Sequence, residues 1–201
     1  MKKFITQEQI QQNKERFIEL IKSIKTEGAD IEGLLRWLDK SDFFKAPSST
    51  KYHCAYEGGL CEHSLNVYDS LIKLVPQFGV EYPEDSLKVV ALLHDIAKAN
   101  FYESYQRNVK DETGKWIQVE EYKVREPEDR FIYGNHEQNS EFMIHTFFPL
   151  SVEESTSILH HHAGMSWDSA KDELSVVYNK YPLAVLLHMA DLAACYITET
   201  R

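Results

Sequence analysis

The dipeptide His94-Asp95 is the feature of the sequence that points most directly to chemistry. It ends the apolar run of VVALLHDIAK, where burying an imidazole and a carboxylate costs free energy unless a partner offsets the cost. A divalent metal ion is such a partner, since mixed nitrogen and oxygen ligands suit Mn²⁺, Fe²⁺, Co²⁺, Ni²⁺ or Zn²⁺. Further candidate ligands stand beside apolar or turn segments elsewhere in the chain: His63, His136, His162 and Asp191.

Helices are the elements expected to bring these residues together. Apolar residues recur at helical spacing over several segments, namely 5–26, 31–40, about 60–74, 83–98, 137–148, 152–162 and the segment after Pro182. His63, His94-Asp95 and Asp191 belong to three of them, beside apolar stripes that must face the same core. Adjacent residues on a helix point about 100° apart, so His94 can bind one ion while Asp95 bridges toward a second.

One segment, 101–133, follows a different pattern. Aromatic and β-branched residues alternate with polar ones on both sides of Gly114, which predicts a β-hairpin insertion with this glycine in the turn, over one end of the bundle. Its aromatic and cationic residues are able to stack on bases, but they also occur in any amphipathic hairpin, and its glutamates oppose nucleic-acid binding. We therefore expect an all-α bundle of six or seven helices with one small hairpin. A single domain 1–201 is expected, with N-terminal helices in 1–45 and the metal-binding core in 50–198.

The composition and net charge of the chain indicate which kinds of substrate and partner to expect. Hydrophobic residues make up 43% of the 201 residues, enough for a sizeable core, and the net charge of −10 repels nucleic-acid phosphates. A small phosphorylated or nucleotide substrate is therefore favoured, while nucleic acid would need a local basic groove. Apolar stretches of about ten residues are too short to cross a bilayer, so no membrane partner is expected. The N-terminus turns polar after two lysines, which predicts a cytoplasmic location.

The three cysteines form no CxxC pair and are expected to be small buried residues that form no disulfide bonds.

With their surrounding motifs, these residues resemble the HD-domain superfamily of metal-dependent phosphohydrolases over about residues 50–198. YHCAYEGGLCEHSLNV is similar to the family segment HHAY.GGL.EH, and HDIAK is similar to HDIGK, with Ala97 where glycine is common. The resemblance implies a helical fold in which one ion is bound by a set of four residues: His63, His94, Asp95 and Asp191.

Family members with two ions add two histidines between the HD pair and the last aspartate. GNHEQNS offers His136, and HHHAG offers His162, which best matches the family position by its offset from Gly164. His161 is the second choice, and His160 is expected to face elsewhere. The resemblance thus implies two divalent transition-metal ions bridged by Asp95.

The implied reaction is hydrolysis of a phosphomonoester or phosphodiester, of a nucleotide or oligonucleotide, by metal-activated water and without a protein nucleophile. Asp95 and Lys98 are the expected catalytic residues, although Lys98 would equally suit a solvated helix end. Expected substrate contacts come from His53, from Lys98 and from free amides at the Gly58-Gly59 turn, which would also serve as a plain N-terminal turn.

Two other functions stay open. Some relatives of this fold hold a di-iron centre and activate oxygen, and a metal ion can also brace a binding module that has no activity. Three further side chains are weighed as supports: Glu62 as a hydrogen-bonding neighbour of the site or an exposed charge, His188 as a hydrogen-bonding neighbour or a core residue, and His145 as structural.

Overall fold

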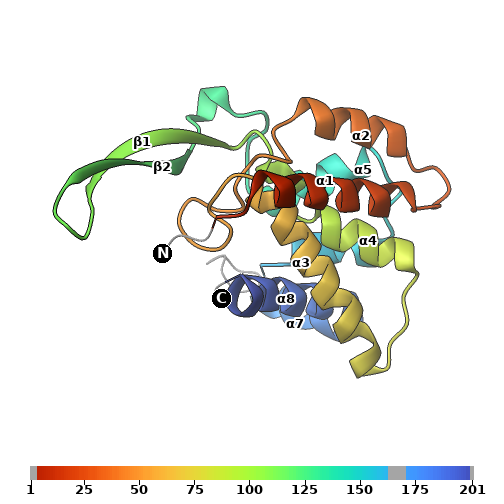
Figure 1. Ribbon diagram of the computed structural model, residues 1–201. Helices are drawn as coiled ribbons and strands as arrows, with labels where there is room; N and C mark the ends of the chain where they lie inside the picture. Colours follow the sequence, from red (N-terminus) through yellow and green to blue (C-terminus); the bar gives the residue numbers. More distant parts are fainter. Residues whose placement is uncertain (1–3, 163–170, 200–201) are drawn as a thin grey trace.

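The computed structural model describes residues 4–162 and 171–199 and has eight α-helices over these ranges (Figure 1). They are α1 Gln7–Lys22, α2 Ile31–Lys40, α3 Gly59–Leu74, α4 Glu84–Leu93, α5 His136–His145, α6 Val152–Leu159, α7 Lys171–Lys180 and α8 Pro182–Ala193. Short 3₁₀ segments lie at η1 Val75–Phe78, η2 Ile96–Lys98 and η3 Pro127–Asp129, and a π-helix, η4, lies at Ala194–Thr198. The predicted all-α fold with a hairpin insertion is confirmed.

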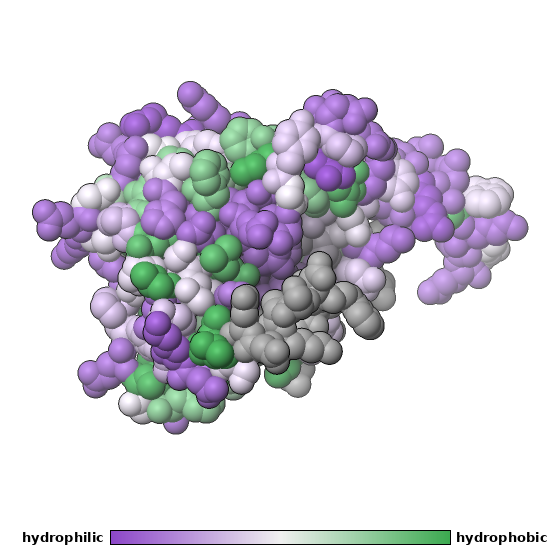
Figure 2. All heavy atoms as spheres, turned by 180° about the vertical axis from the view of Figure 1, so that it is seen from behind, coloured by the Kyte–Doolittle hydropathy of each residue, from purple (hydrophilic) through white to green (hydrophobic). Residues whose placement is uncertain are grey.

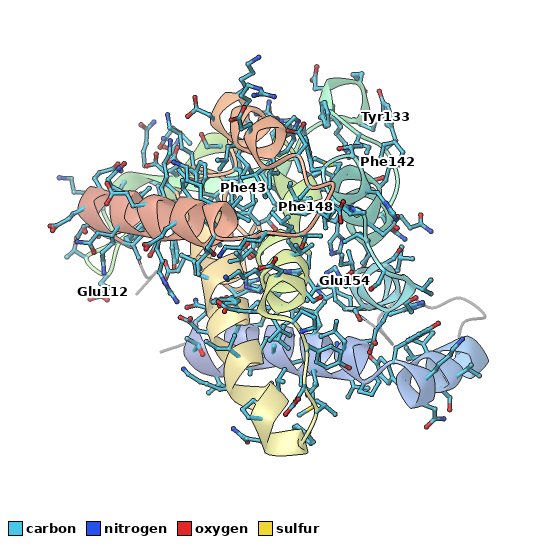
Figure 3. The ribbon with its side chains drawn as sticks, turned by 90° about the vertical axis from the view of Figure 1, so that its right-hand side faces the viewer. Phe43, Glu112, Tyr133, Phe142, Phe148 and Glu154 are labelled. Atoms are coloured by element: carbon cyan, nitrogen blue, oxygen red, sulfur yellow. The ribbon has the colours of Figure 1, made fainter. Side chains whose placement is uncertain are left out.

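The helices enclose one hydrophobic core. α3 lies at its centre, packed against α1, α4 and α8 (Figure 1). Phe43 and Phe148 are buried among the helices, whereas Tyr133 and Phe142 lie at the outer edge with more than half of their surface exposed (Figure 3). Since α3, α4 and α8 all contribute to this core, polar side chains on their inner faces are forced close to one another.

The hairpin consists of antiparallel strands β1 (Tyr102–Lys110) and β2 (Trp116–Val124), and Gly114 occupies its turn with φ of +83°. It projects away from the helical body, which differs from the predicted position over one end of the bundle (Figure 1). Only Tyr102, at the base, is buried, and the rest of the hairpin surface is mostly hydrophilic (Figure 2). Polar residues on both faces of the ribbon explain why it does not pack onto the core.

Four predicted helices end earlier than expected, and two of them, α5 at His145 and α6 at Leu159, end three residues early. The first ends at Lys22, and the fourth ends at Leu93, so that His94 and Asp95 occupy a turn between α4 and η2 instead of a continuous helix to Lys98. The turn lets Asp95 direct its carboxylate into the core.

The sequence-based prediction also missed a helix, α7, whose mixed sequence KDELSVVYNK has only a weak apolar stripe. Across 4–162 and 171–199, no single helix has the length and apolar character needed to cross a membrane. Leu174–Lys180 and Pro182–Thr198 reach that length only together, and a bend of 106° separates them.

Candidate metal centre

The carboxylate of Asp95 is fully buried and lies between two groups of histidines. Oδ2 is 3.6 Å from Nε2 of His63 and 3.5 Å from Nε2 of His94. Oδ1 is 3.5 Å from Nε2 of His136 and 3.5 Å from Nε2 of His161. The two oxygens of one side chain thus face two different pairs of imidazole nitrogens.

The group at Oδ2 is completed by Asp191 from α8. Its Oδ1 lies 3.3 Å from Nε2 of His63, on α3. His94 Nδ1 lies 2.9 Å from the carbonyl oxygen of Ala91, to which it donates a hydrogen bond. A donor at Nδ1 leaves a lone pair on Nε2 in the neutral ring. Burial, together with neighbouring His161 and His63, outweighs the pull of Asp95 and lowers the pKa of His94 to about 3, so this ring is neutral.

The group at Oδ1 is formed at the start of α5 and the end of α6. Asn135 caps α5 by accepting a hydrogen bond from the Gln138 amide, which places His136 in the first turn. His161 Nδ1 donates to the Ile158 carbonyl at 2.6 Å, so its Nε2 is left to face Asp95. Within the described residues, neither His161 Nε2 nor Asp95 Oδ1 has a hydrogen-bond partner, although both atoms are buried.

This donor set fits divalent metal ions. Buried polar atoms without hydrogen-bond partners are rare in folded proteins and call for an explanation such as a bound ion. The ligand atoms of His63, His94 and Asp191 lie within 4.8 Å of one another, as do those of His94, Asp95 and His161. Imidazole nitrogens with carboxylate oxygens suit the first-row transition metals.

All three consecutive histidines of HHHAG reach this part of the molecule. His162 Nε2 lies 3.3 Å from Asp191 Oδ2, and its Nδ1 lies 2.9 Å from His136 Nε2. His161 is the one that faces Asp95 directly. His160, which was expected to face elsewhere, lines the adjacent cavity instead.

Lys98 is buried and not a solvated helix end. Its Nζ donates to Asp95 Oδ2 at 2.6 Å, and the residue is 7% exposed. Burial disfavours the charged form of both side chains. The positive charge of Lys98 nevertheless helps to hold the pKa of Asp95 well below its usual range, and the negative charge of Asp95 raises the pKa of Lys98. The pair keeps Asp95 ionised and oriented.

Two glutamates that the sequence-based prediction did not assign to the site contact its histidines. Glu199 Oε1 accepts from His63 Nδ1 at 3.0 Å. Glu137 lies 3.4 Å from His136 Nδ1 through Oε2 and 3.2 Å from His162 Nδ1 through Oε1. Glu137 follows a predicted ligand directly, which is a usable signal, whereas no local pattern marks Glu199.

A cavity of about 700 Å³ lies beside the histidines. His136, His162 and Asp191 reach its wall, so it connects the candidate metal centre to solvent. His53, predicted as a substrate contact, also lines it, and its ring lies 4.8 Å from that of His63. Tyr52 lines the cavity with 86% of its surface exposed. The cavity is large enough to admit a small-molecule ligand.

The Gly58-Gly59 turn does not offer free amides, and this expectation is corrected. The amide of Gly58 donates to the Lys45 carbonyl and that of Gly59 to the Tyr56 carbonyl. Both glycines are required by packing: a Cβ at Gly58 would approach Ile10 to 2.9 Å, and one at Gly59 would lie 2.0 Å from the carbonyl oxygen of Cys54. The turn is a plain, buried helix start.

The contacts of His188, Glu62 and His145 show which of them lies next to the site. His188 Nδ1 donates to the His161 carbonyl at 2.6 Å, so it is a hydrogen-bonding neighbour of the site and not only a core residue. Glu62 accepts from the Tyr56 hydroxyl, and His145 pairs with Glu141 at the surface. The three cysteines are free and buried, as expected.

Comparison with known proteins agrees with this geometry. The family model for the HD domain matches residues 60–192, which includes His63, His94, Asp95 and Asp191. The chain belongs to the HD domain family. A similar protein is dihydroneopterin 2',3'-cyclic phosphate phosphodiesterase of Methanocaldococcus jannaschii, 40% identical over 62 residues, which cover 29% of this chain and 25% of that protein. No solved structure matches the chain. Membership of the HD domain family and the phosphodiesterase relative support the prediction that the chain is a hydrolase.

Proposed function

We propose that this HD domain protein is a phosphohydrolase with two divalent transition-metal ions, acting on a small phosphate ester. The observation that carries the proposal is the placement of Asp95, whose two oxygens face separate pairs of imidazole nitrogens. One carboxylate in this position is suited to bridge two ions.

The proposed ligands fall into two sets that share Asp95. His63, His94 and Asp191 hold one ion, and His136 and His161 hold the other. His161 replaces His162 as our first choice, because its Nε2 faces Asp95 Oδ1 while both ring nitrogens of His162 have other partners. Bound ions of this kind lower the pKa of a water molecule and neutralise charge on a phosphoryl group.

The chain's own residues provide binding and orientation. The cavity beside the histidines admits the ester, and Lys98 holds Asp95 by donating to Oδ2. Lys98 does not line the cavity, so we propose it as a positioning residue and not as a phosphate contact. His53 stays a proposed substrate contact because it lines the cavity wall.

The proposed substrate class is a small phosphodiester carrying an aromatic base. The M. jannaschii relative acts on a 2',3'-cyclic phosphate, as its name states, and the exposed Tyr52 at the cavity supports an aromatic group. The net charge of −10 supports a small ester over nucleic acid. A cytoplasmic location remains a prediction.

The test is a screen of the purified protein with added Mn²⁺ or Fe²⁺. We expect hydrolysis of bis-p-nitrophenyl phosphate and of nucleoside or pterin 2',3'-cyclic phosphates, lost in Asp95→Asn. Consumption of oxygen by the iron-loaded protein, with phosphate esters left intact, would instead favour the oxygen-activating alternative. Bound metal without either reaction would favour the non-catalytic module.

A further inference from the structure

Glu199 is a buried carboxylate that directly follows η4, close to the candidate metal centre. It faces Nδ1 of His63, whereas Asp95 and Asp191 face Nε2 of the same ring. The residue is 6% exposed. Its Oε1 accepts from His63 Nδ1 at 3.0 Å and from Asn66 Nδ2 at 3.1 Å. Both of these partners lie on α3, so Glu199 links the end of the α8–η4 segment to the helix that presents His63.

The π-helix is what brings Glu199 to this position. In a regular α-helix, residues 191 and 199 would lie about 80° apart around the axis, because eight steps of 100° exceed two turns by that amount. In η4 the Glu199 amide donates to the carbonyl of Ala194, five residues earlier, at 3.0 Å. The wider turn reduces this rotation, so that Asp191 and Glu199 contact the same imidazole through its two nitrogens.

We propose that Glu199 is a positioning residue that fixes the His63 ring with Nδ1 protonated and Nε2 facing Asp95 and Asp191. This inference rests on the proposed function, since it takes His63 to be a metal ligand. Carboxylates that accept from the distal nitrogen of a ligating histidine orient the ring and raise its basicity. The ring of His53, 4.8 Å from that of His63, packs against the same imidazole.

The experiment compares zinc binding by wild type, Glu199→Gln and Glu199→Ala in competition with a chromophoric chelator. The matched control is Glu153→Gln, because Glu153 also accepts two hydrogen bonds, from the Tyr82 hydroxyl and the Leu183 amide, but lies outside the site. Loss of such a partner typically costs about 10- to 100-fold in metal affinity, and we expect this loss for one of the bound ions in both Glu199 variants. Glu153→Gln should bind zinc like wild type.

A second readout does not depend on affinity. In ¹⁵N-labelled, zinc-loaded wild type, long-range ¹H–¹⁵N spectra should show His63 protonated at Nδ1 and ligating through Nε2, and Glu199→Gln should alter these shifts. Circular dichroism establishes that each variant is folded, and the near-isosteric glutamine carries the test if the alanine variant unfolds.

The outcomes separate this inference from the proposed function. If both Glu199 variants bind zinc like wild type while Asp95→Asn does not, the role of Glu199 is overturned and the proposed function stands. If wild type binds no divalent ion, both the positioning role of Glu199 and the proposed function are overturned. Equal weakening in Glu153→Gln and Glu199→Gln would also overturn the positioning role, because the effect would then be general destabilisation.

Discussion

His63 and His94 direct their Nε2 atoms at each other across 3.3 Å, although 31 positions separate them in the chain. At most one proton fits between two ring nitrogens at this distance. His94 is neutral, so the proton belongs to His63: burial disfavours its charge, but Glu199 and Asp191 outweigh burial and raise its pKa to about 10. A cation placed between the two rings would take the position of that proton.

Asp95→Asn is expected to lose most of the bound metal. The amide keeps the size of the side chain but removes the charge shared by the two groups of histidines. Metal analysis of the purified protein should fall from near two ions per chain to well below one. Asp69→Asn, which disrupts the Arg16–Asp69 ion pair between α1 and α3, provides the control and should keep its metal.

Lys98→Met is expected to destabilise the metal-free protein strongly. It leaves the buried Asp95 carboxylate without its ammonium partner, and such a loss typically costs about 3–5 kcal/mol. Metal should restore part of the stability, because bound ions supply the missing positive charge and ligands that bind only the folded state stabilise it. Thermal unfolding with and without Mn²⁺ measures both effects. An equal loss of stability in both conditions would contradict the proposed ligation by Asp95.

Metal binding is expected to release a proton near neutral pH. His63 carries a proton below its pKa of about 10 and must lose it to become a ligand. Affinity should therefore rise with pH from neutral to about 10. Calorimetric titration with Zn²⁺, in two buffers of different ionisation enthalpy, measures the proton release directly.

The same proton on His63 is expected to make the stability of the metal-free protein fall with rising pH, whereas metal affinity rises. The pKa of His63 is raised from 6.5 to about 10 in the folded state, so its imidazolium contributes stability that is fully present below pH 6.5. This contribution should be lost as pH rises through 10. Denaturant unfolding of the metal-free protein between pH 7 and 10 should show a decrease that His63→Gln lacks.

Tyr52→Ala is expected to raise KM for a substrate with an aromatic base and to leave kcat nearly unchanged. Tyr52 lines the cavity, and 86% of its surface is exposed. Stacking of a base on an aromatic ring is worth about 1–3 kcal/mol, which corresponds to a rise in KM of about 5- to 150-fold. Tyr52→Phe should behave like wild type. An unchanged KM in the alanine variant would argue against stacking on this ring.

Replacement of the hairpin residues 103–123 by a short Gly/Ser turn is expected to leave both folding and hydrolysis of small esters intact. The ribbon projects from the helical body, and neither strand contributes to the cavity wall. Kinetics with bis-p-nitrophenyl phosphate and thermal unfolding check this. A large fall in kcat/KM would identify the hairpin as a part of the active site.

The sequence by itself determined the helical fold, the hairpin with Gly114 in its turn, and the residue types of the candidate centre. These properties depend on periodicity and on short motifs, which are local. HDIAK and the apolar stripes around His63 and Asp191 are visible without knowledge of how the helices pack.

Tertiary structure decided the features that depend on contacts between distant segments. Whether His161 or His162 faces Asp95 follows from where α6 ends against α5, and the pairing of Lys98 follows from the turn that closes α4. The amides of Gly58 and Gly59 donate hydrogen bonds to backbone carbonyls, although the local motif predicted that they would be free. Glu199 lies 136 positions from His63, and only a wide helical turn, set by packing of the α8–η4 segment on α3, brings its carboxylate to that ring.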